Sequence, residues 1–382
     1  MSRAAPPGAS SPGACSCPAL SSRAPSSGAS ASRAPPDGRT GPLPVLVVPD
    51  SFKGTFSANE VAHAIAEGLR AAGREARELP VADGGEGTMG VLVSALGGEV
   101  RTITVTDPLG RPVEAAFALL PDGSAVVEMA QASGLSLVAE ADRDAWSAST
   151  RGSGELIATA AKAGASPIVV TVGGSATTDG GAGALEALKE AGFAPAAPRS
   201  SRRSSATSRP RDRDLHVLCD VRVPFEDAPR VFGPQKGADP ATVKRLEKRL
   251  AELAKRWKRD PRGEPMTGAA GGVAGGLWAE LGAKLVPGAA YVLDAVGFDR
   301  LMRAARYVVT GEGRIDEQTL TGKLVGEVAT RCRQGGVACH ALVGQDRLDL
   351  FGHRVIDLGY VREATTLAEL EKAGRELATQ IG

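Results

Sequence analysis

One glycine-rich stretch constrains the fold of this 382-residue chain more than any other segment: residues 173–183 read Gly-Gly-Ser-Ala-Thr-Thr-Asp-Gly-Gly-Ala-Gly. It follows a β-branched apolar run at residues 168–172 and precedes a helical pattern that begins near Ala184. The order strand, glycine loop, helix directs free backbone N–H groups and a helix N-terminus at an anion, most often a phosphate. Neither the GxxxxGK[ST] nor the GxGxxG pattern is present, so a tight strand-to-helix connection is the alternative interpretation.

The side chains of this loop favour a binding role. Ser175, Thr177 and Thr178 add hydroxyl donors to the glycine amides, and Asp179 places a carboxylate in a loop otherwise suited to anions. A carboxylate in that setting is useful if it holds a metal ion or accepts a proton. Asp179 is therefore our first candidate for the catalytic carboxylate.

Four further loops combine glycine with charged residues: 49–55, 83–88, 232–237 and 310–316, with Lys323 shortly after the last. The first precedes a helix expected at about 58–72, for which Ser57 and Glu60 form a capping box. Four of the five loops follow β-rich runs, and in open parallel sheets the loops at the carboxyl ends of strands converge on the ligand. Glycine amides, lysines, an arginine and carboxylates together favour phosphoryl transfer, which depends on positioning and charge neutralisation.

The whole sequence indicates an α/β fold, because strands expected at 45–48, 102–106, 125–129, 168–172, 215–218 and 307–310 alternate with helical patterns. Aromatic residues make up only 4% of the chain, so the cores must consist of Ala, Val and Leu. The net charge is +1, but residues 1–42 carry +3 and residues 199–213 carry +5, which leaves −7 on the remainder. This mildly acidic body argues against a nucleic-acid partner.

Residues 1–42 are rich in Ala, Ser, Pro and Gly and are expected to be disordered. No run of 18 apolar residues predicts a membrane span. Five cysteines without a repeating framework are typical of a reducing compartment, so we expect a cytoplasmic protein.

The five loops, in their order along the chain, resemble the signatures of the bacterial glycerate kinase family (type 1). The resemblance is carried by Ser51-Phe52-Lys53-Gly54, Asp83-Gly84-Gly85-Glu86-Gly87-Thr88, Gly173-Gly174-Ser175-Ala176-Thr177 with Asp179-Gly180-Gly181-Ala182-Gly183, Phe232-Gly233-Pro234-Gln235-Lys236-Gly237 and Thr310-Gly311-Glu312-Gly313-Arg314-Ile315-Asp316. It extends from about Leu43 to Gly344 and implies a phosphotransferase that uses ATP and Mg²⁺ to phosphorylate D-glycerate.

The resemblance also implies two α/β domains. One is Rossmann- or flavodoxin-like and built from both chain ends, residues 43–90 and 286–382, and the second is inserted at residues 91–285. A homo-oligomer is left open, as is the choice between the 2- and the 3-hydroxyl of glycerate.

Two regions depart from the family. Residues 194–213 are basic and of low complexity, and Arg222-Val223-Pro224 stands where the family usually has Thr-Asn-Pro. These departures suggest one alternative to a kinase, an inactive nucleotide-binding relative. The other alternative is a phosphate-binding hydrolase, which would use similar loops.

Site roles follow from side-chain chemistry. Arg314 is expected to bind the glycerate carboxylate, because a guanidinium pairs with a carboxylate in a bidentate fork. The candidate catalytic residues are Asp179, Lys53, Arg314 and Asp316. The candidates for binding ATP are Ser51, Lys53, Gly173, Gly174, Ser175, Thr177, Gly180 and Lys236. The candidate Mg²⁺ ligands are Asp83, Glu86 and Asp220, since Mg²⁺ takes one or two carboxylates beside phosphate oxygens and water.

Overall fold

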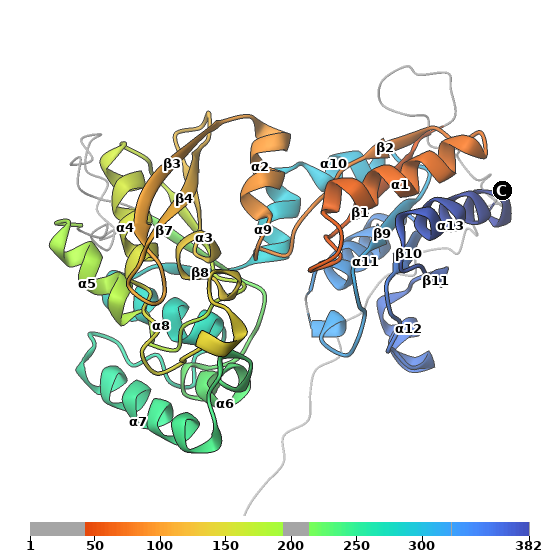
Figure 1. Ribbon diagram of the computed structural model, residues 1–382. Helices are drawn as coiled ribbons and strands as arrows, with labels where there is room; N and C mark the ends of the chain where they lie inside the picture. Colours follow the sequence, from red (N-terminus) through yellow and green to blue (C-terminus); the bar gives the residue numbers. More distant parts are fainter. Residues whose placement is uncertain (1–42, 194–213, 322, 382) are drawn as a thin grey trace, which may run out of the picture. The chain divides into compact units, whose positions relative to one another are not determined.

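A computed structural model describes residues 43–193, 214–321 and 323–381 (Figure 1). The expected N-terminal tail at 1–42 and the basic segment at 194–213 lie outside these residues. Within the described parts, the helices and strands form two separate sheets, each with its own helical cover.

The first sheet is wholly parallel, with the strand order β11-β10-β9-β1-β2. Its strands are β1 (Val45–Pro49), β2 (Ala76–Glu78), β9 (Val308–Gly311), β10 (Cys339–Val343) and β11 (Val361–Glu363). Counted along this part of the chain, the order across the sheet is 2-1-3-4-5, the flavodoxin-like arrangement, which reverses direction between β1 and β9. Both chain ends contribute, so the predicted α/β class with one half built from both ends is confirmed.

Helices cover both faces of this sheet because its strands alternate apolar side chains between two cores. Val45, Val47 and Val309 pack with α1 and α13, which lie side by side in Figure 1, whereas Leu46 and Val308 face the core that includes α11. The helices of this half are α1 (Ala58–Ala71), α10 (Phe298–Arg303), α11 (Leu324–Gly335), α12 (Leu350–Ile356) and α13 (Leu367–Gln380). The capping box predicted for α1 is present, with Ser57 and Glu60 each bonded to the other's backbone N–H.

The second sheet is mixed, in the order β3-β4-β5-β6-β7-β8, antiparallel up to β5 and parallel from β5 to β8. Its strands are β3 (Glu99–Thr106), β4 (Pro112–Leu119), β5 (Ala125–Glu128), β6 (Ile168–Thr171), β7 (Leu215–Cys219) and β8 (Lys284–Pro287). Its helices are α3 (Ala130–Ser133), α4 (Arg151–Lys162), α5 (Ala182–Glu190), α6 (Ala228–Phe232), α7 (Pro240–Arg256) and α8 (Ala269–Leu281). Leucines and valines of β5 to β7 form one core with α4 and α8.

Two helices flank the insertion: α2 (Thr88–Leu96) follows the 83–88 loop, and α9 (Gly288–Ala295) follows β8. The segments that lead into these two helices pass very close to each other, since a Cβ on Gly84 would lie 2.5 Å from the Cα of Gly288. Only glycine at both positions permits this crossing, and it holds the 83–88 loop beside β7, where Leu218 is the next neighbour.

None of the helices in the described parts of the chain is both long enough and apolar enough to span a bilayer. The cysteines that the structure describes, Cys219, Cys332 and Cys339, are free and buried.

Candidate active site

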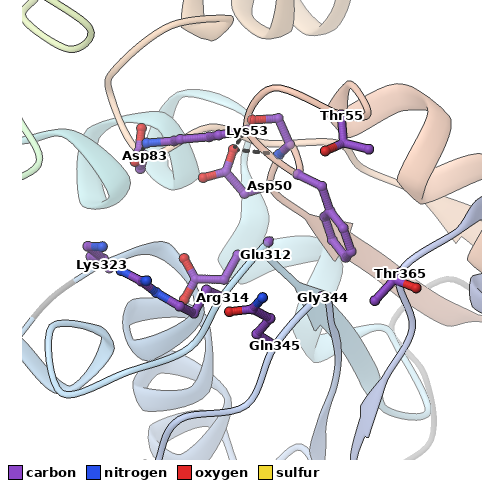
Figure 2. Close-up of a pocket in the computed structure, with 13 residues that line it drawn as sticks. Asp50, Lys53, Thr55, Asp83, Glu312, Arg314, Lys323, Gly344, Gln345 and Thr365 are labelled. Atoms are coloured by element: carbon purple, nitrogen blue, oxygen red, sulfur yellow. Dashed lines mark hydrogen bonds and ion pairs between the residues drawn. The ribbon is translucent and has the colours of Figure 1, made fainter.

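A cavity of about 440 Å³ lies at the carboxyl ends of the first sheet, where β1 and β9 meet (Figure 2). This is the point at which the strand order reverses, and ligands of open α/β sheets bind at such points. The loops after β1, β9 and β10 supply most of the lining. The lining residues are Asp50, Ser51, Phe52, Lys53, Thr55, Asp83, Glu312, Gly313, Arg314, Lys323, Gly344, Gln345 and Thr365.

Strand pairing places two carboxyl groups in this cavity. Pro49 and Gly311 are register partners in β1 and β9, so Asp50 and Glu312, the next residues, leave neighbouring strands together. The Asp50 N–H donates to the Gly311 carbonyl at 2.8 Å. Gly311 must be glycine, because a Cβ there would lie 2.2 Å from the Leu342 carbonyl oxygen. Close strand packing therefore fixes the separation of the two acids.

Lys53 and Asp83 form an ion pair across the cavity, with 2.6 Å between Nζ and Oδ2. Asp83 is buried and also accepts the Gly85 N–H at 3.0 Å, whereas 58% of the Lys53 side chain is exposed. Burial by itself would lower the pKa of Lys53, but the charges of Asp83 and Asp50 outweigh it and raise the pKa above its ordinary value. Lys53 is thus a permanent cation that solvent and a ligand can reach.

The two acids at the strand ends have pKa values raised above their ordinary range. Burial and the nearby charge of Asp83 raise the pKa of Asp50 well above its usual range, although Asp50 accepts the Ser51 N–H at 2.6 Å. Burial also raises the pKa of Glu312 to about 7, against the opposing effects of a Thr319 hydrogen bond and the Lys323 charge. The cavity therefore holds a carboxyl group whose charge changes near neutral pH.

Two further cations line the cavity. Arg314 is 59% exposed, and its Nε lies 3.2 Å from Oδ2 of Asp316. Lys323 precedes α11 and acts electrostatically on both Glu312 and Asp220. Figure 2 shows Lys53 extending toward Asp83, and Glu312 between Asp50 and Arg314. Three cations at one cavity suit a ligand with several negative charges.

Of the carboxylates predicted to bind Mg²⁺, Asp83 and Asp220 act on each other electrostatically, whereas Glu86 lines a neighbouring cavity. Burial and the Asp83 charge raise the pKa of Asp220, which also senses Lys53 and Lys323, so Asp220 belongs to the same charged cluster. Glu86 is exposed and lines a neighbouring cavity with Ser51 and Lys53. Among the residues that the structure describes, no three His, Cys, Asp or Glu side chains converge as a metal site.

Asp179, the first-ranked catalytic candidate, does not line this cavity, and its carboxylate accepts four hydrogen bonds from the protein. Oδ2 accepts the Thr150 N–H, the Thr150 hydroxyl and the Gly183 N–H, and Oδ1 accepts the Gly181 N–H, all within 3.1 Å. These donors belong to the first turns of α4 and α5, where a negative charge is favourable. The carboxylate of Asp179 thus occupies the anion position that the sequence suggested for a phosphate, and its placement favours a structural role.

Lys236 lies in the same buried region as Asp179. The ammonium, at the end of the short 3₁₀ turn η4 (Pro234–Lys236), donates to the Ser175 hydroxyl at 2.7 Å and to the Thr177 carbonyl at 2.6 Å. Burial lowers the pKa of Lys236 to about 7, although the charge of Asp179 acts in the opposite direction. With 2% of its surface exposed, Lys236 ties two loops together.

The glycines of this loop are used for packing. A Cβ on Gly173 would lie 2.7 Å from the Cα of Gly85, and one on Gly174 would lie 2.7 Å from the Glu86 carboxylate. The Gly180 N–H is bonded to the Gly271 carbonyl at 3.1 Å. Gly173 and Gly174 therefore hold the 173–183 loop against the 83–88 loop.

The structure brings some of the predicted residues to one cavity and separates others. Four of them line the cavity: Ser51, Lys53, Asp83 and Arg314. Asp220 interacts with the charges of cavity residues, and Asp316, which does not line the cavity, forms an ion pair with Arg314. The candidates in the 173–183 loop and Lys236 do not line it.

Asp50 and Glu312 lie within the glycine loops 49–55 and 310–316, and Lys323 follows the second, but the sequence predicted no role for them. The available signal was their position directly after strands or before a helix, beside the charged residues that were chosen. Arg222, at the departure from the family pattern, lines a different cavity with Arg259 and Trp278.

Comparison with known proteins identifies the group to which this chain belongs. Residues 45–369 match the glycerate kinase family. The chain is 42% identical over 323 residues to a glycerate kinase of Halalkalibacterium halodurans, which covers 78% of this chain and 85% of that protein. It is 40% identical over 304 residues to the glycerate 2-kinase of Escherichia coli K12, which covers 74% of this chain and 80% of that protein.

A solved structure agrees with these relatives. The crystal structure of a candidate glycerate kinase 2 from Salmonella typhimurium LT2 superposes with a TM-score of 0.71 at 33% identity, over 89% of this chain and 98% of that one. With the family matched over most of the sequence and the fold shared, this chain belongs to the glycerate kinase family.

Proposed function

We propose that this protein transfers the γ-phosphoryl group of ATP to a hydroxyl of D-glycerate. The observation that carries the proposal is the cavity at the β1/β9 switch point, which gathers Lys53, Arg314 and Lys323 beside buried carboxyl groups. Phosphoryl transfer to a hydroxy acid requires cations for the phosphates and the acid, and a proton acceptor for the attacking hydroxyl. Membership of the glycerate kinase family supports this substrate pair.

The exposed cations divide between the two substrates. Arg314 is the candidate for the glycerate carboxylate, because its planar fork matches two carboxylate oxygens and its partner Asp316 keeps it oriented toward the cavity rim. Lys53 and Lys323, near the starts of α1 and α11, are the candidates for the phosphates. This assignment replaces Lys236 as a phosphate ligand, because its ammonium is already shared between Ser175 and Thr177.

Mg²⁺ is proposed to enter with the nucleotide. Asp220 is the best-placed protein ligand, because Asp83 already holds Lys53 and Gly85 with its two oxygens. A single carboxylate is sufficient where phosphate oxygens and water complete the shell. The ion would neutralise charge on the transferred phosphate.

The decisive experiment is a coupled ADP assay with and without D-glycerate and Mg²⁺. We expect ADP only when both are present. Equal release without glycerate would indicate a phosphate-binding hydrolase, and none under any condition would indicate an inactive relative.

Phosphorus NMR of the product then identifies the hydroxyl. We propose the 2-hydroxyl, supported by the 40% identity to a relative named glycerate 2-kinase. Formation of 3-phosphoglycerate would contradict this. A cytoplasmic location is likewise proposed, to be checked by fractionation.

A further inference from the structure

A buried carboxyl group in the cavity has a geometry that no part of the binding scheme above uses. Glu312 is 8% exposed, and its Oε1 accepts a hydrogen bond from the Thr319 hydroxyl at 2.9 Å. Within the described residues no donor is seen on the other oxygen, Oε2. Oε1 is therefore anchored by Thr319, while the Glu312 side chain lines the cavity.

Thr319 is built to hold this carboxyl group. It is fully buried at the start of the short 3₁₀ turn η5 (Thr319–Thr321), and its Oγ1 also accepts the Asp316 N–H at 3.1 Å. Because that N–H occupies an acceptor position on Oγ1, the hydroxyl proton is directed at Glu312. Thr319 thus holds both Glu312 and Asp316, the residue that pairs with Arg314.

The charges that face Glu312 come from every side of the cavity. Lys323 at the start of α11 and Lys53 after β1 favour its ionised form, and Asp83 opposes it. Asp50 faces it from the end of β1, and Arg314 lies two residues along its own loop. Burial dominates this balance and raises the pKa of Glu312 to about 7, close to the value at which a general base works best at neutral pH.

We propose that Glu312 is the general base of the transfer and that Thr319 is its positioning residue. The attacking hydroxyl of the acceptor forms the new O–P bond while its proton passes to Oε2 of Glu312. The bond between the γ-phosphorus and the bridging oxygen breaks, and its electron pair leaves with ADP. This inference rests on the proposed function and adds the identity of the proton acceptor.

Asp50 is the competing carboxyl group. It is buried at 3% exposure and its Oδ1 takes both the N–H and the hydroxyl of Ser51. Burial first, and then the charge of Asp83, raise the pKa of Asp50 well above its usual range, which favours its protonated form over a proton acceptor. Glu312 is favoured because Thr319 positions its carboxyl group and because that group ionises near neutral pH.

The test is the pH dependence of kcat/KM for glycerate in full-length variants. A general base must be ionised, so kcat/KM of the parent falls as pH drops through the pKa of Glu312. Glu312→Gln keeps an acceptor for Thr319 and should lower kcat by about 10²–10⁴-fold, with the acid limb removed. Asp50→Asn is the matched control, and its acid limb should persist.

Thr319 gives a second readout that a merely structural role would not move. Its hydrogen bond lowers the pKa of Glu312, so Thr319→Val should shift the acid limb upward by on the order of one pH unit, while Thr319→Ser should leave it in place. Both variants are informative even if Glu312→Gln fails to fold.

The outcomes separate cleanly. An inactive parent overturns the proposed function itself. An active parent whose Glu312→Gln variant turns over within about threefold, with an unchanged acid limb, overturns only the base assignment. The assignment is also overturned if Asp50→Asn removes the limb, or if Thr319→Val and Thr319→Ser behave alike.

Discussion

The cavity at the β1/β9 switch point and the 173–183 loop resemble each other in sequence, but Lys53 in the first reaches solvent and Asp179 in the second is buried. Both place glycine and an aspartate after a strand, and each has a lysine beside it, Lys53 within the 49–55 loop and Lys236 from the 232–237 loop. In the cavity, Lys53 is exposed and its pKa is raised, whereas Lys236 is buried against the loop and its pKa is lowered to about 7. The difference indicates that a glycine loop with charges is open to a ligand only where a charged side chain reaches solvent.

The largest effect expected from this contrast is on Lys53. Lys53→Met removes an exposed cation from the proposed phosphate site and should lower kcat/KM by about 10²–10³-fold, the usual cost of losing one electrostatic stabiliser. The melting temperature should also fall, because the buried carboxylate of Asp83 loses its ion-pair partner, so turnover is compared per folded molecule. The measurement is steady-state kinetics with a melting curve.

Lys255→Met is the matched control for Lys53. Lys255 is equally exposed and also ion-paired, with Glu252, but lies on α7. Its kinetics should equal those of the parent. If Lys53→Met also matches the parent, the cavity is not the phosphate site.

Replacement of Asp179 should lower stability rather than turnover. Asp179→Asn removes acceptor capacity from a buried carboxylate that holds four donors, and should cost about 2–4 kcal/mol of folding free energy. Turnover per folded molecule should stay within about threefold. Urea unfolding and active-site-normalised kinetics check both parts.

Asp50→Asn is the counterpart for stability. Burial raises the pKa of Asp50 and so favours the uncharged form that an amide resembles, and the variant should therefore preserve the unfolding free energy. A steep loss of turnover in Asp179→Asn with unchanged stability would restore Asp179 as the catalytic carboxylate.

Lys236 predicts a pH dependence of stability. The folded pKa of about 7 lies below the ordinary value of 10.5, so between these values the unfolded chain binds the extra proton. Stability should therefore rise with pH from 7 to 10.5, by at most ~1.4 kcal/mol per pH unit. Lys236→Met should flatten this rise, as followed by urea unfolding at several pH values.

Lys53→Met supplies the contrast here as well. The pKa of Lys53 is raised in the fold, so its contribution is complete below 10.5 and its removal should leave the slope intact. Parallel curves for the parent and Lys236→Met would mean that Lys236 is protonated in the fold throughout this range.

Arg314 should show the smallest effect. Arg314→Lys keeps the positive charge but loses the bidentate fork, so the KM for glycerate should rise by about tenfold with a smaller change in kcat. Arg101→Lys, which alters a surface pair with Glu99 on β3, is the control. A rise in the KM for ATP instead would place Arg314 at the nucleotide.

The sequence was sufficient to predict the α/β class and the strands with strong apolar runs, such as β1 and β6. It did not predict β4, whose Pro-Val-Glu-Ala-Ala-Phe-Ala-Leu pattern is held by antiparallel pairing with β3. The short edge strands β2 and β11 were also missed, because three residues carry little periodicity. Pairing partners, rather than local propensity, form these strands.

The candidate site was predictable in its residue types but not in its grouping. Lys53, Asp83 and Arg314 were recognised from motifs, and the structure brings them together. Asp179 has the same glycine setting, yet its carboxylate already accepts four hydrogen bonds from donors at the starts of α4 and α5. Whether a polar atom is already hydrogen-bonded within the protein depends on contacts distant in sequence, such as that of Thr150 with Asp179. No local sequence pattern reveals these contacts.

The pairing of β1 with β9 also affects how the protein folds. The Thr310 hydroxyl bonds the Val48 carbonyl, a contact between residues 262 positions apart. Such long-range pairing is slow to form, because the chain entropy of closing a large loop must be overcome before any contact compensates it. The second sheet, made of strands within the intervening segment, has no need to wait for that closure. Asp50 and Glu312 meet only once β1 and β9 have joined, so the candidate cavity cannot form before this long-range pairing is complete.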